Sequence, residues 1–369
     1  MIASSVEGHV PVTSLVTHVT DQLTRLCRVT GADPVMSAQL VADLLGPAGP
    51  RPLDAGPAWP SDIADDHTPV EFSVAFHRHS RPTLRILAEA AVADLSRPAD
   101  LSSALAFLHR QTRRHRLTTA RLDRVLDLFT TERPQGVFGM WHSLILRRTP
   151  EFKVYLNPEI RGVADADALV TEALGRLGAA PAHRAVRLRG LRPGELGAAD
   201  RFTFFALDLH DADSARIKLY VSQHDADLAD VARAAAMVPG VDTGTVTSFC
   251  RQAAGPGPYT GRPIISSYTY AAGADRPIGY SVYVPIRSYV TDDAQARDRI
   301  RGLMDRHGFD PEQLGPAMAA VTSRPLDEGA GLLAHVSLRL GPPRPGVTVY
   351  LSSEAYSVSA PQPQRVPAR

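Results

Sequence analysis

Four short segments of this 369-residue chain share one alternation of side chains, which constrains the fold more than any other feature. In the clearest of them, Arg216, Lys218 and Tyr220 alternate with two aliphatic residues. Successive side chains of a β-strand point to opposite faces of a sheet, so the alternation predicts strands with one polar and one aliphatic face. The other three segments are residues 153–156, 281–284 and 348–351.

The use of lysine points to the same segments. Of the 40 basic residues only Lys153 and Lys218 are lysine, and each stands two positions before a tyrosine, Tyr155 or Tyr220. A lysine ammonium is a compact point charge, whereas an arginine guanidinium is a planar fork, so the choice indicates a specific site. Solvated cations on an amphipathic strand are the alternative for any single segment. Four segments of one design favour a shared polar site.

A helical stretch followed by two strands recurs about every 65 residues, which is typical of a repeated structural unit. The turns within the strand pairs fall near residues 80, 148, 212, 275 and 343. Five units give ten strands, and strands joined by short turns pair antiparallel and tend to close at this number. Helices must cover the aliphatic faces. We therefore expect an α+β fold of five ααββ units: a ten-stranded antiparallel β-barrel with a polar, solvent-filled lumen, surrounded by helices.

The helices are expected where apolar residues recur at the helical period. A single domain is predicted over residues 1–359, and the Pro-, Gln- and Arg-rich residues 360–369 are expected to be a disordered tail. Residues 46–69, rich in Pro, Gly and Asp, are expected to form a long loop. The expected helical stretches are residues 12–45, 98–131, 164–177, 225–237, 245–253, 294–307 and 311–322.

Composition excludes several classes of protein. The formal net charge of +1 argues against a nucleic-acid partner, because binding a phosphate backbone requires a concentrated basic surface. The sequence has no apolar run long enough to predict a membrane span, and residues 1–7 do not have the pattern of a signal peptide. A cytoplasmic protein is therefore expected. Its expected state is a monomer or homodimer. Cys27 and Cys250 are expected to be packing residues.

A lumen lined by cations and tyrosines suits an anion with many oxygens, such as a diphosphate. Tyrosine rings can also flank a carbocation through cation–π contacts. The chain contains neither a Walker loop nor an aspartate-rich segment that would hold Mg²⁺, so diphosphate binding by side-chain cations alone is expected, with no metal and no cofactor.

Glu71 is the acidic residue best placed within a predicted strand. It shares parity with Ser73, opposite to Phe72, and should face the chamber. Two interpretations are open: a carboxylate that accepts a hydrogen bond from a substrate N–H or O–H and acts as base, or a salt bridge to Arg85 or another lumen cation. Asp208, at a strand end beside a turn, is expected to be solvated.

Together these segments resemble the dimethylallyltryptophan synthase family of aromatic prenyltransferases, in particular its bacterial indole-prenylating members. The resemblance runs from about residue 12 to residue 356. Its motifs, specific through their order and spacing, are Pro69-Val70-Glu71-Phe72-Ser73, Leu84-Arg85, Lys153-Val154-Tyr155-Leu156-Asn157-Pro158, Arg216-Ile217-Lys218-Leu219-Tyr220-Val221, Tyr283-Val284-Pro285 and Val349-Tyr350-Leu351-Ser352.

The resemblance implies the same barrel of five ααββ units and a role for each matching residue. Glu71 matches the acid that hydrogen-bonds the indole N–H and assists deprotonation, and Glu71 and Lys153 are the implied catalytic residues. Ser281 stands where the family often has glutamine. Arg201 is a candidate for the substrate carboxylate, and Tyr356 for a further tyrosine of the cage. The implied diphosphate-binding and cation-shielding residues are Arg85, Lys153, Tyr155, Arg216, Lys218, Tyr220, Ser281, Tyr283 and Tyr350.

The expected activity is therefore metal-independent transfer of a dimethylallyl group from dimethylallyl diphosphate to the indole ring of L-tryptophan or a related indole, by electrophilic aromatic substitution. Two alternatives stay open. One is prenylation of another aromatic acceptor, such as tyrosine, a hydroxynaphthalene or an indole-containing peptide. The other is a non-catalytic barrel that binds an anionic ligand, although a carboxylate among the cations would not benefit such a binder.

Overall fold

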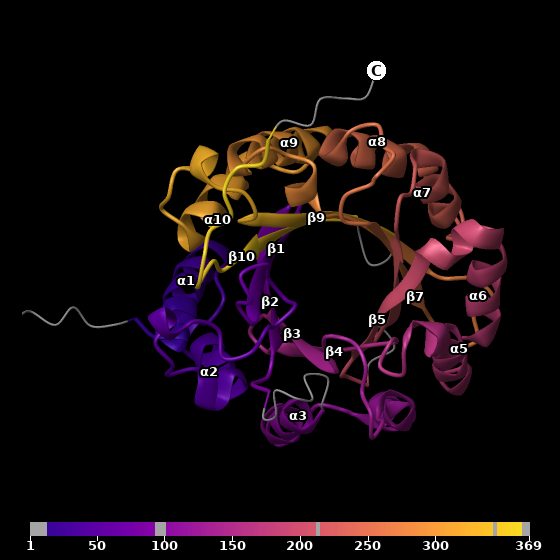
Figure 1. Ribbon diagram of the computed structural model, residues 1–369, viewed down its shortest axis with the longest axis horizontal. Coiled ribbons are helices and arrows are strands. Elements are labelled where there is room, and N and C mark those ends of the chain that lie inside the picture. Colours follow the sequence, from indigo (N-terminus) through magenta and orange to yellow (C-terminus); the bar gives the residue numbers. More distant parts are fainter. Residues whose placement is uncertain (1–12, 93–100, 212–214, 342–344, 364–369) are drawn as a thin grey trace, which may run out of the picture.

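The computed structural model describes residues 13–92, 101–211, 215–341 and 345–363. Within these residues ten antiparallel strands form a closed barrel, in which strands adjacent in sequence pair and β10 pairs with β1 (Figure 1). The strands are β1 (Val70–His77), β2 (Ser80–Glu89), β3 (Met140–Leu146), β4 (Glu151–Leu156), β5 (Asp200–Asp208), β6 (Ile217–Gln223), β7 (Ile264–Tyr270), β8 (Gly279–Val284), β9 (Leu333–Leu340) and β10 (Gly346–Ser352).

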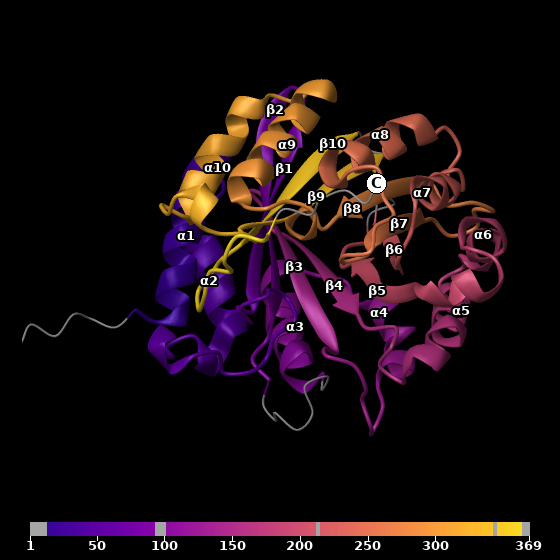
Figure 2. The same cartoon turned by 45° about the horizontal axis from the view of Figure 1, so that its top comes forward.

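Two helices precede each pair of strands, which confirms the predicted ααββ unit and its five repeats. The helices form a ring around the barrel (Figures 1 and 2). In the described ranges they are α1 (Leu15–Thr30), α2 (Pro34–Leu45), α3 (Ser102–His115), α4 (Ala120–Asp123), α5 (Ala166–Arg176), α6 (Ala180–Ala185), α7 (Leu228–Ala235), α8 (Thr243–Ala254), α9 (Asp293–Arg306) and α10 (Leu314–Val321).

The hydrophobic core lies between the barrel and the helices. In β6, Ile217, Leu219 and Val221 are fully buried in this core, while Lys218 and Tyr220 point the other way, into the barrel. Burying one such aliphatic side chain contributes about 1.5–3 kcal/mol to the free energy of folding, so each strand turns its aliphatic face towards the helices. The polar lumen and aliphatic exterior predicted from the alternation are confirmed.

Several element boundaries differ from the sequence prediction. The helical stretch at 12–45 is two helices, because Gly31 adopts a left-handed conformation (φ 79°) and Asp33 caps the next helix. The stretch predicted at 98–131 contains only α3, α4 and a 3₁₀ turn, and residues 98–100 lie outside the described ranges. Helix α6 and the π-helical turn Val186–Gly190 lie in a stretch for which no helix is expected from the sequence.

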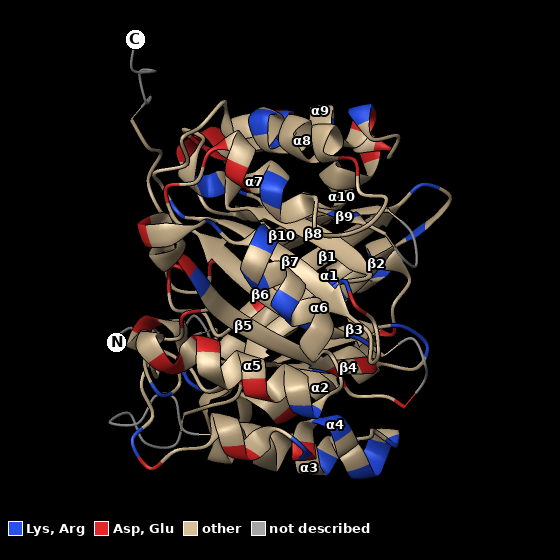
Figure 3. Ribbon diagram, turned by 90° about the vertical axis from the view of Figure 1, so that its right-hand side faces the viewer, with Lys and Arg blue, Asp and Glu red and all other residues tan. Residues whose placement is uncertain are grey.

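On the side of the molecule drawn in Figure 3, the helices carry both basic and acidic residues. No helix in the described part of the chain has the length and apolar character needed to cross a membrane. Cys27 and Cys250 are both buried and unpaired with each other, as expected for packing residues. Of the predicted tail, residues 364–369 lie outside the described ranges, and Gln362 donates a hydrogen bond to the Thr291 carbonyl at 2.7 Å.

Candidate active site

The barrel encloses a chamber of about 330 Å³ that opens to solvent. All nine residues proposed for the diphosphate and its cation, Ser281 included, line it together with Glu71. Strands β2, β4, β6, β8 and β10 contribute all of them except Arg216, which directly precedes β6, and they do so through one repeated pair of positions, two residues apart. The pairs are Arg85 and Leu87, Lys153 and Tyr155, Lys218 and Tyr220, Ser281 and Tyr283, and Thr348 and Tyr350.

Three of the first positions, Arg85, Lys153 and Lys218, form a layer of cations together with Arg216 and Arg339. Lys153 and Lys218 are about 95% buried. Burial lowers the pKa of Lys153 to about 8, although Asp208 opposes the shift. Burial also lowers the pKa of Lys218 well below its ordinary value, and the nearby cations Lys153 and Arg216 add to that effect. The layer is therefore a concentrated positive site with little solvent to screen it.

Asp208 is the counter-charge of this layer, and the expectation that it is solvated was wrong. Its side chain is 3% exposed and lies 2.9 Å from the Lys153 ammonium and 2.7 Å from Nε of Arg216. Burial alone would raise the pKa of Asp208, but attraction to these two cations outweighs it and holds the pKa below its usual range. Lys153 and Asp208 are opposite each other in the β4–β5 register, which sequence parity does not reveal.

The second position of the pairs forms a belt of tyrosines. Ring centroids lie 5.6 Å apart between Tyr155 and Tyr220, 5.5 Å between Tyr220 and Tyr283, and 5.9 Å between Tyr283 and Tyr350. The hydroxyls of Tyr155 and Tyr220 are 3.2 Å apart. The Lys218 ammonium lies 5.3 Å from the Tyr220 ring centre, a cation–π distance. A continuous aromatic surface thus covers the cation layer.

Leu87 takes the place of a tyrosine in the pair on β2, so the belt has an aliphatic member there. It lies directly across from Glu71 in the β1–β2 register. Trp141 and Phe204 pack beside it, and the Trp141 ring stacks on Phe138 at 4.1 Å between centroids. This side of the chamber is therefore an apolar wall made mainly of aromatic rings, against which a planar ring can pack.

Glu71 is the carboxylate beside that wall. It is 5% exposed, and burial raises its pKa to about 8, partly offset by Arg287 and reinforced by Asp65. Among the described residues, no salt bridge joins Glu71 to Arg85 or to another lumen cation, which was one of the two arrangements open from the sequence. A carboxyl group whose pKa is raised close to physiological pH can both release and accept a proton there.

A group of charged side chains stands near Glu71 and was not found from the sequence. Arg287 Nε lies 3.0 Å from Oδ2 of Asp65, and Arg262 pairs with the other oxygen of Asp65 at 2.5 Å. Arg262, Arg287 and Asp62 all line the chamber. They come from loops and a 3₁₀ turn (Ile286–Ser288), where no strand period marks the inward side chains.

Strand β9 contributes further lumen residues, His335, Ser337 and Arg339. Burial and the neighbouring Arg85 lower the pKa of Arg339 to about 10, so Arg339 belongs to the cation layer. The alternation of polar and apolar residues in β9 is the same signal that marks β6. It identifies Arg339 once the strand is assigned.

Two candidates from the resemblance are not brought to the chamber. Arg201 pairs with Glu159 and lines a separate hollow of about 500 Å³ on the outside of the barrel, between α5 and the π-helical turn. Tyr356 packs against the main hydrophobic core and is not among the residues of the chamber wall. The structure thus offers Arg262 and Arg287 near the chamber in place of Arg201.

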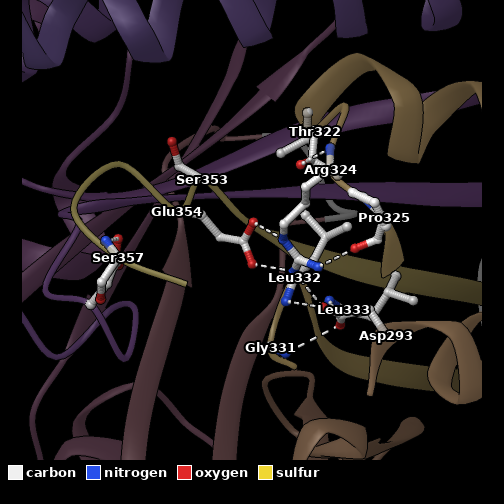
Figure 4. Close-up of polar contacts among 12 residues, drawn as sticks. Asp293, Thr322, Arg324, Pro325, Gly331, Leu332, Leu333, Ser353, Glu354 and Ser357 are labelled. Carbon is white, nitrogen blue, oxygen red and sulfur yellow. Dashed lines mark hydrogen bonds and ion pairs between the residues drawn. The ribbon is translucent and has the colours of Figure 1, made fainter. Parts of the chain in front are cut away.

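A buried network anchors the segment that follows β10 (Figure 4). Asp293 accepts hydrogen bonds from the backbone N–H groups of residues 331–333, at 3.1, 3.2 and 3.0 Å. Arg324 bridges Asp293 and Glu354, with distances of 2.5 and 2.6 Å. Glu354 lines a small hollow together with Glu71. The network therefore holds the chain in place next to the site carboxylate.

Comparison with known proteins agrees with this geometry. Residues 35–315 match the family described as tryptophan dimethylallyltransferase. A solved 6-dimethylallyl tryptophan synthase is 57% identical, with a TM-score of 0.91 over 95% of this chain and 99% of that one. The 6-dimethylallyltryptophan synthase from Micromonospora olivasterospora, solved with DMASPP and Trp, is also 57% identical, with a TM-score of 0.90 over 95% of this chain and 100% of that one.

A more distant relative has the same architecture. The 5-dimethylallyl tryptophan synthase from Streptomyces coelicolor, also solved in complex with DMASPP and Trp, is 36% identical, with a TM-score of 0.86 over 97% of this chain and 100% of that one. The barrel, its cation layer and its tyrosine belt, taken with these matches, establish that the chain belongs to the tryptophan dimethylallyltransferase family.

Proposed function

We propose that the protein transfers a dimethylallyl group from dimethylallyl diphosphate to the indole ring of L-tryptophan. The observation that carries this proposal is the meeting, in one chamber, of a cation layer, a tyrosine belt, an aromatic wall and the buried carboxylate of Glu71. The DMASPP and Trp bound in two related synthases support the same pair of substrates.

The cation layer binds the diphosphate. Arg85, Arg216 and Arg339 offer planar donors and the two buried lysines offer point charges, so the oxygens of both phosphoryl groups find charge-assisted hydrogen bonds. Lys153 is the catalytic member of the layer in this proposal, because its ammonium stabilises the charge that grows on the leaving diphosphate. Ser281 provides a hydroxyl on the same level of the barrel.

Ionisation breaks the bond between the allylic carbon and the diphosphate oxygen, and the electron pair leaves with the diphosphate. The tyrosine rings then face the allyl cation, stabilise it through their π electrons and exclude water that would quench it. Tyr155, Tyr220, Tyr283 and Tyr350 neighbour one another in space, so together they enclose the cation on the side away from the acceptor.

The acceptor ring is placed against the aromatic wall at Leu87 and Trp141. There Glu71 accepts a hydrogen bond from the indole N–H, which raises the electron density of the ring. The ring π electrons form the new carbon–carbon bond with the allyl cation. The ring proton at the attacked carbon is then lost, and Glu71 assists this deprotonation. No electrons are gained or lost overall.

The charged groups near Glu71 suit the zwitterionic part of tryptophan. Arg262 and Arg287 can bind the α-carboxylate, while Asp62 and Asp65 complement the α-ammonium. In this arrangement the amino-acid end lies towards the loops and the indole points to the cation. Arg201 is not part of the proposal.

The ring position is proposed from similarity. The relatives at 57% identity carry the name 6-dimethylallyltryptophan synthase, whereas a relative at 36% identity carries the name 5-dimethylallyl tryptophan synthase. We therefore expect attachment at carbon 6 of the indole.

One assay tests the function. The protein is mixed with dimethylallyl diphosphate and L-tryptophan in the presence of EDTA, and the product is characterised by mass spectrometry and NMR. A tryptophan heavier by one dimethylallyl group is expected, without added metal. A panel containing tyrosine, a hydroxynaphthalene and an indole-containing peptide runs in parallel, and prenylation of one of these in place of tryptophan would overturn the acceptor. Absence of product from every acceptor would overturn the enzyme.

Cytoplasmic location and a monomeric or homodimeric state remain proposals from the sequence. Cell fractionation tests the first, and light scattering coupled to size-exclusion chromatography tests the second.

A further inference from the structure

Glu89, the last residue of β2, is a buried carboxylate outside the mechanism above. Its side chain accepts hydrogen bonds from the indole N–H of Trp59 at 2.9 Å and from that of Trp141 at 3.2 Å. These two residues are the only tryptophans of the chain. The side chain of Ser61 adds a third hydrogen bond. One carboxylate therefore joins three donors from two separate parts of the fold.

The first part is strand β3. Trp141 lies opposite Glu89 in the β2–β3 register and forms the aromatic wall of the chamber. Its ring stacks on Phe138 and packs against Phe204 at 5.4 Å between centroids. Packing holds the ring between its neighbours, and the hydrogen bond from its N–H to the Glu89 carboxylate adds a directional contact that selects one orientation of the indole.

The second part is the loop that precedes β1. Trp59 and Ser61 bring this loop to Glu89, and the next residues, Asp62 and Ile63, line the chamber. Ile63 packs in the same small apolar cluster as Trp141. Glu89 thus holds both Trp141 of the aromatic wall and the loop that carries Asp62, one of the charged groups proposed to bind the amino-acid part of the substrate.

A charge at this place is costly for stability. Glu89 is 3% exposed, its donors are neutral, and no ion pair to it occurs among the residues that the structure describes. A buried carboxylate without a cation is less favourable than a neutral group of the same shape. Its benefit is geometric, since a carboxylate accepts from several donors at once and an amide offers only one oxygen.

We propose that Glu89 is a positioning residue for the acceptor: by holding Trp141 and residues 59–63 together, it sets the wall against which the indole lies and so governs acceptor affinity and the ring position that is attacked. This inference rests on the proposed function. It assigns no contact between Glu89 and either substrate.

The test compares Glu89→Gln with Trp141→Phe, which keeps a ring but removes the N–H, and with Glu195→Gln as a matched control on an exposed 3₁₀ turn (Gly194–Ala199). For Glu89→Gln we expect KM for tryptophan to rise about tenfold and a second regioisomer to form, with KM for the donor within about twofold of wild type. Trp141→Phe should change KM for tryptophan in the same direction, and the double variant should add little to the larger single effect.

Intrinsic fluorescence gives a readout that does not depend on turnover. Because both tryptophans bind Glu89, Glu89→Gln should change the wavelength of maximum emission of the free protein, and Glu195→Gln should not. Thermal unfolding of each variant separates a local change from loss of folding.

The possible failures are distinguishable. No prenylated product from the wild-type protein would overturn the proposed function. Turnover by wild type with an unchanged tryptophan KM and a single regioisomer in Glu89→Gln would overturn this inference alone. Equal increases of both KM values would also overturn it, because they would indicate general destabilisation. If Glu89→Gln does not fold, Trp141→Phe decides through the same KM ratio and product distribution.

Discussion

The Lys153 ammonium lies 2.9 Å from Oδ1 of Asp208, so the cation layer proposed to bind the diphosphate contains its own counter-anion. Asp208 also pairs with Arg216. In the free protein this carboxylate neutralises part of the layer and holds two cations in fixed positions. In the proposed site a bound diphosphate would compete with Asp208 for the same donors. We therefore expect the pair to limit how tightly the product diphosphate is retained.

Asp208→Asn should separate these two effects. Loss of the negative charge leaves the buried Lys153 and the partly buried Arg216 without a counter-charge, and we expect the free energy of unfolding to fall by about 3 kcal/mol. Inorganic diphosphate should then raise the melting temperature more in the variant than in wild type, because it restores the missing charge. Differential scanning fluorimetry with and without diphosphate measures both. An equal stabilisation of the two proteins would contradict the competition.

A pH dependence follows from the buried lysines. The pKa of Lys153 is about 8 in the folded protein, below the ordinary 10.5, so the unfolded chain binds more protons between these values. The free energy of unfolding of the free protein should therefore rise with pH across this window. Bound diphosphate favours the charged lysines, so its binding should take up protons and weaken as the pH rises above 8.

Calorimetry checks this prediction by titrating diphosphate at pH 8 in two buffers of different ionisation enthalpy. Lys153→Arg should take up fewer protons, because a guanidinium stays charged. Binding by wild type without proton uptake would show that both lysines are already fully charged in the free protein.

The raised pKa of Glu71 predicts how the reaction rate depends on pH on the acid side of its optimum, the acid limb of the pH–rate profile. Its pKa is about 8 in the free protein, and the carboxyl must be ionised to accept the indole N–H. The kcat/KM for tryptophan should rise with pH up to about 8. Arg287 lowers this pKa, so Arg287→Leu should move the limb to higher pH. Glu71→Gln should remove the limb and lower kcat about 100-fold. The same profile in wild type and Glu71→Gln would exclude Glu71 from the proton step.

The inner residues found from the sequence are those on strands with a local period of two. Lys218 and Tyr220 needed only the alternation of their own strand, and that alternation also required the barrel to be polar inside. The partner of Lys153 could not be found in this way, since it depends on the register between two strands. Arg287 and Asp62 lie on segments without a regular period, where only the three-dimensional structure shows which side chains turn inward.

Arg262 and Arg201 provide a matched pair for the amino-acid end of the substrate. Arg262 lines the chamber, whereas Arg201 lines the outer hollow. Arg262→Leu should raise KM for tryptophan about tenfold, because a charge-assisted hydrogen bond to the carboxylate is lost. Its effect on indole, which has no carboxylate, should be small. Arg201→Leu should leave both values unchanged. An effect of Arg201→Leu on tryptophan alone would restore the sequence-based candidate.

The role of the tyrosine belt can be tested by measuring how the allyl cation partitions between water and tryptophan. Tyr220 lies between Tyr155 and Tyr283, so its removal opens the centre of the belt. In Tyr220→Ala, water should reach the cation, and the ratio of dimethylallyl alcohol to prenylated tryptophan should rise about tenfold as cation–π stabilisation and exclusion of water are lost. Tyr220→Phe keeps the ring and should keep the ratio near that of wild type. Quantifying both products by liquid chromatography measures the partition directly. An unchanged ratio in Tyr220→Ala, with the melting temperature preserved, would show that water is excluded by the acceptor and the barrel walls instead of by this ring.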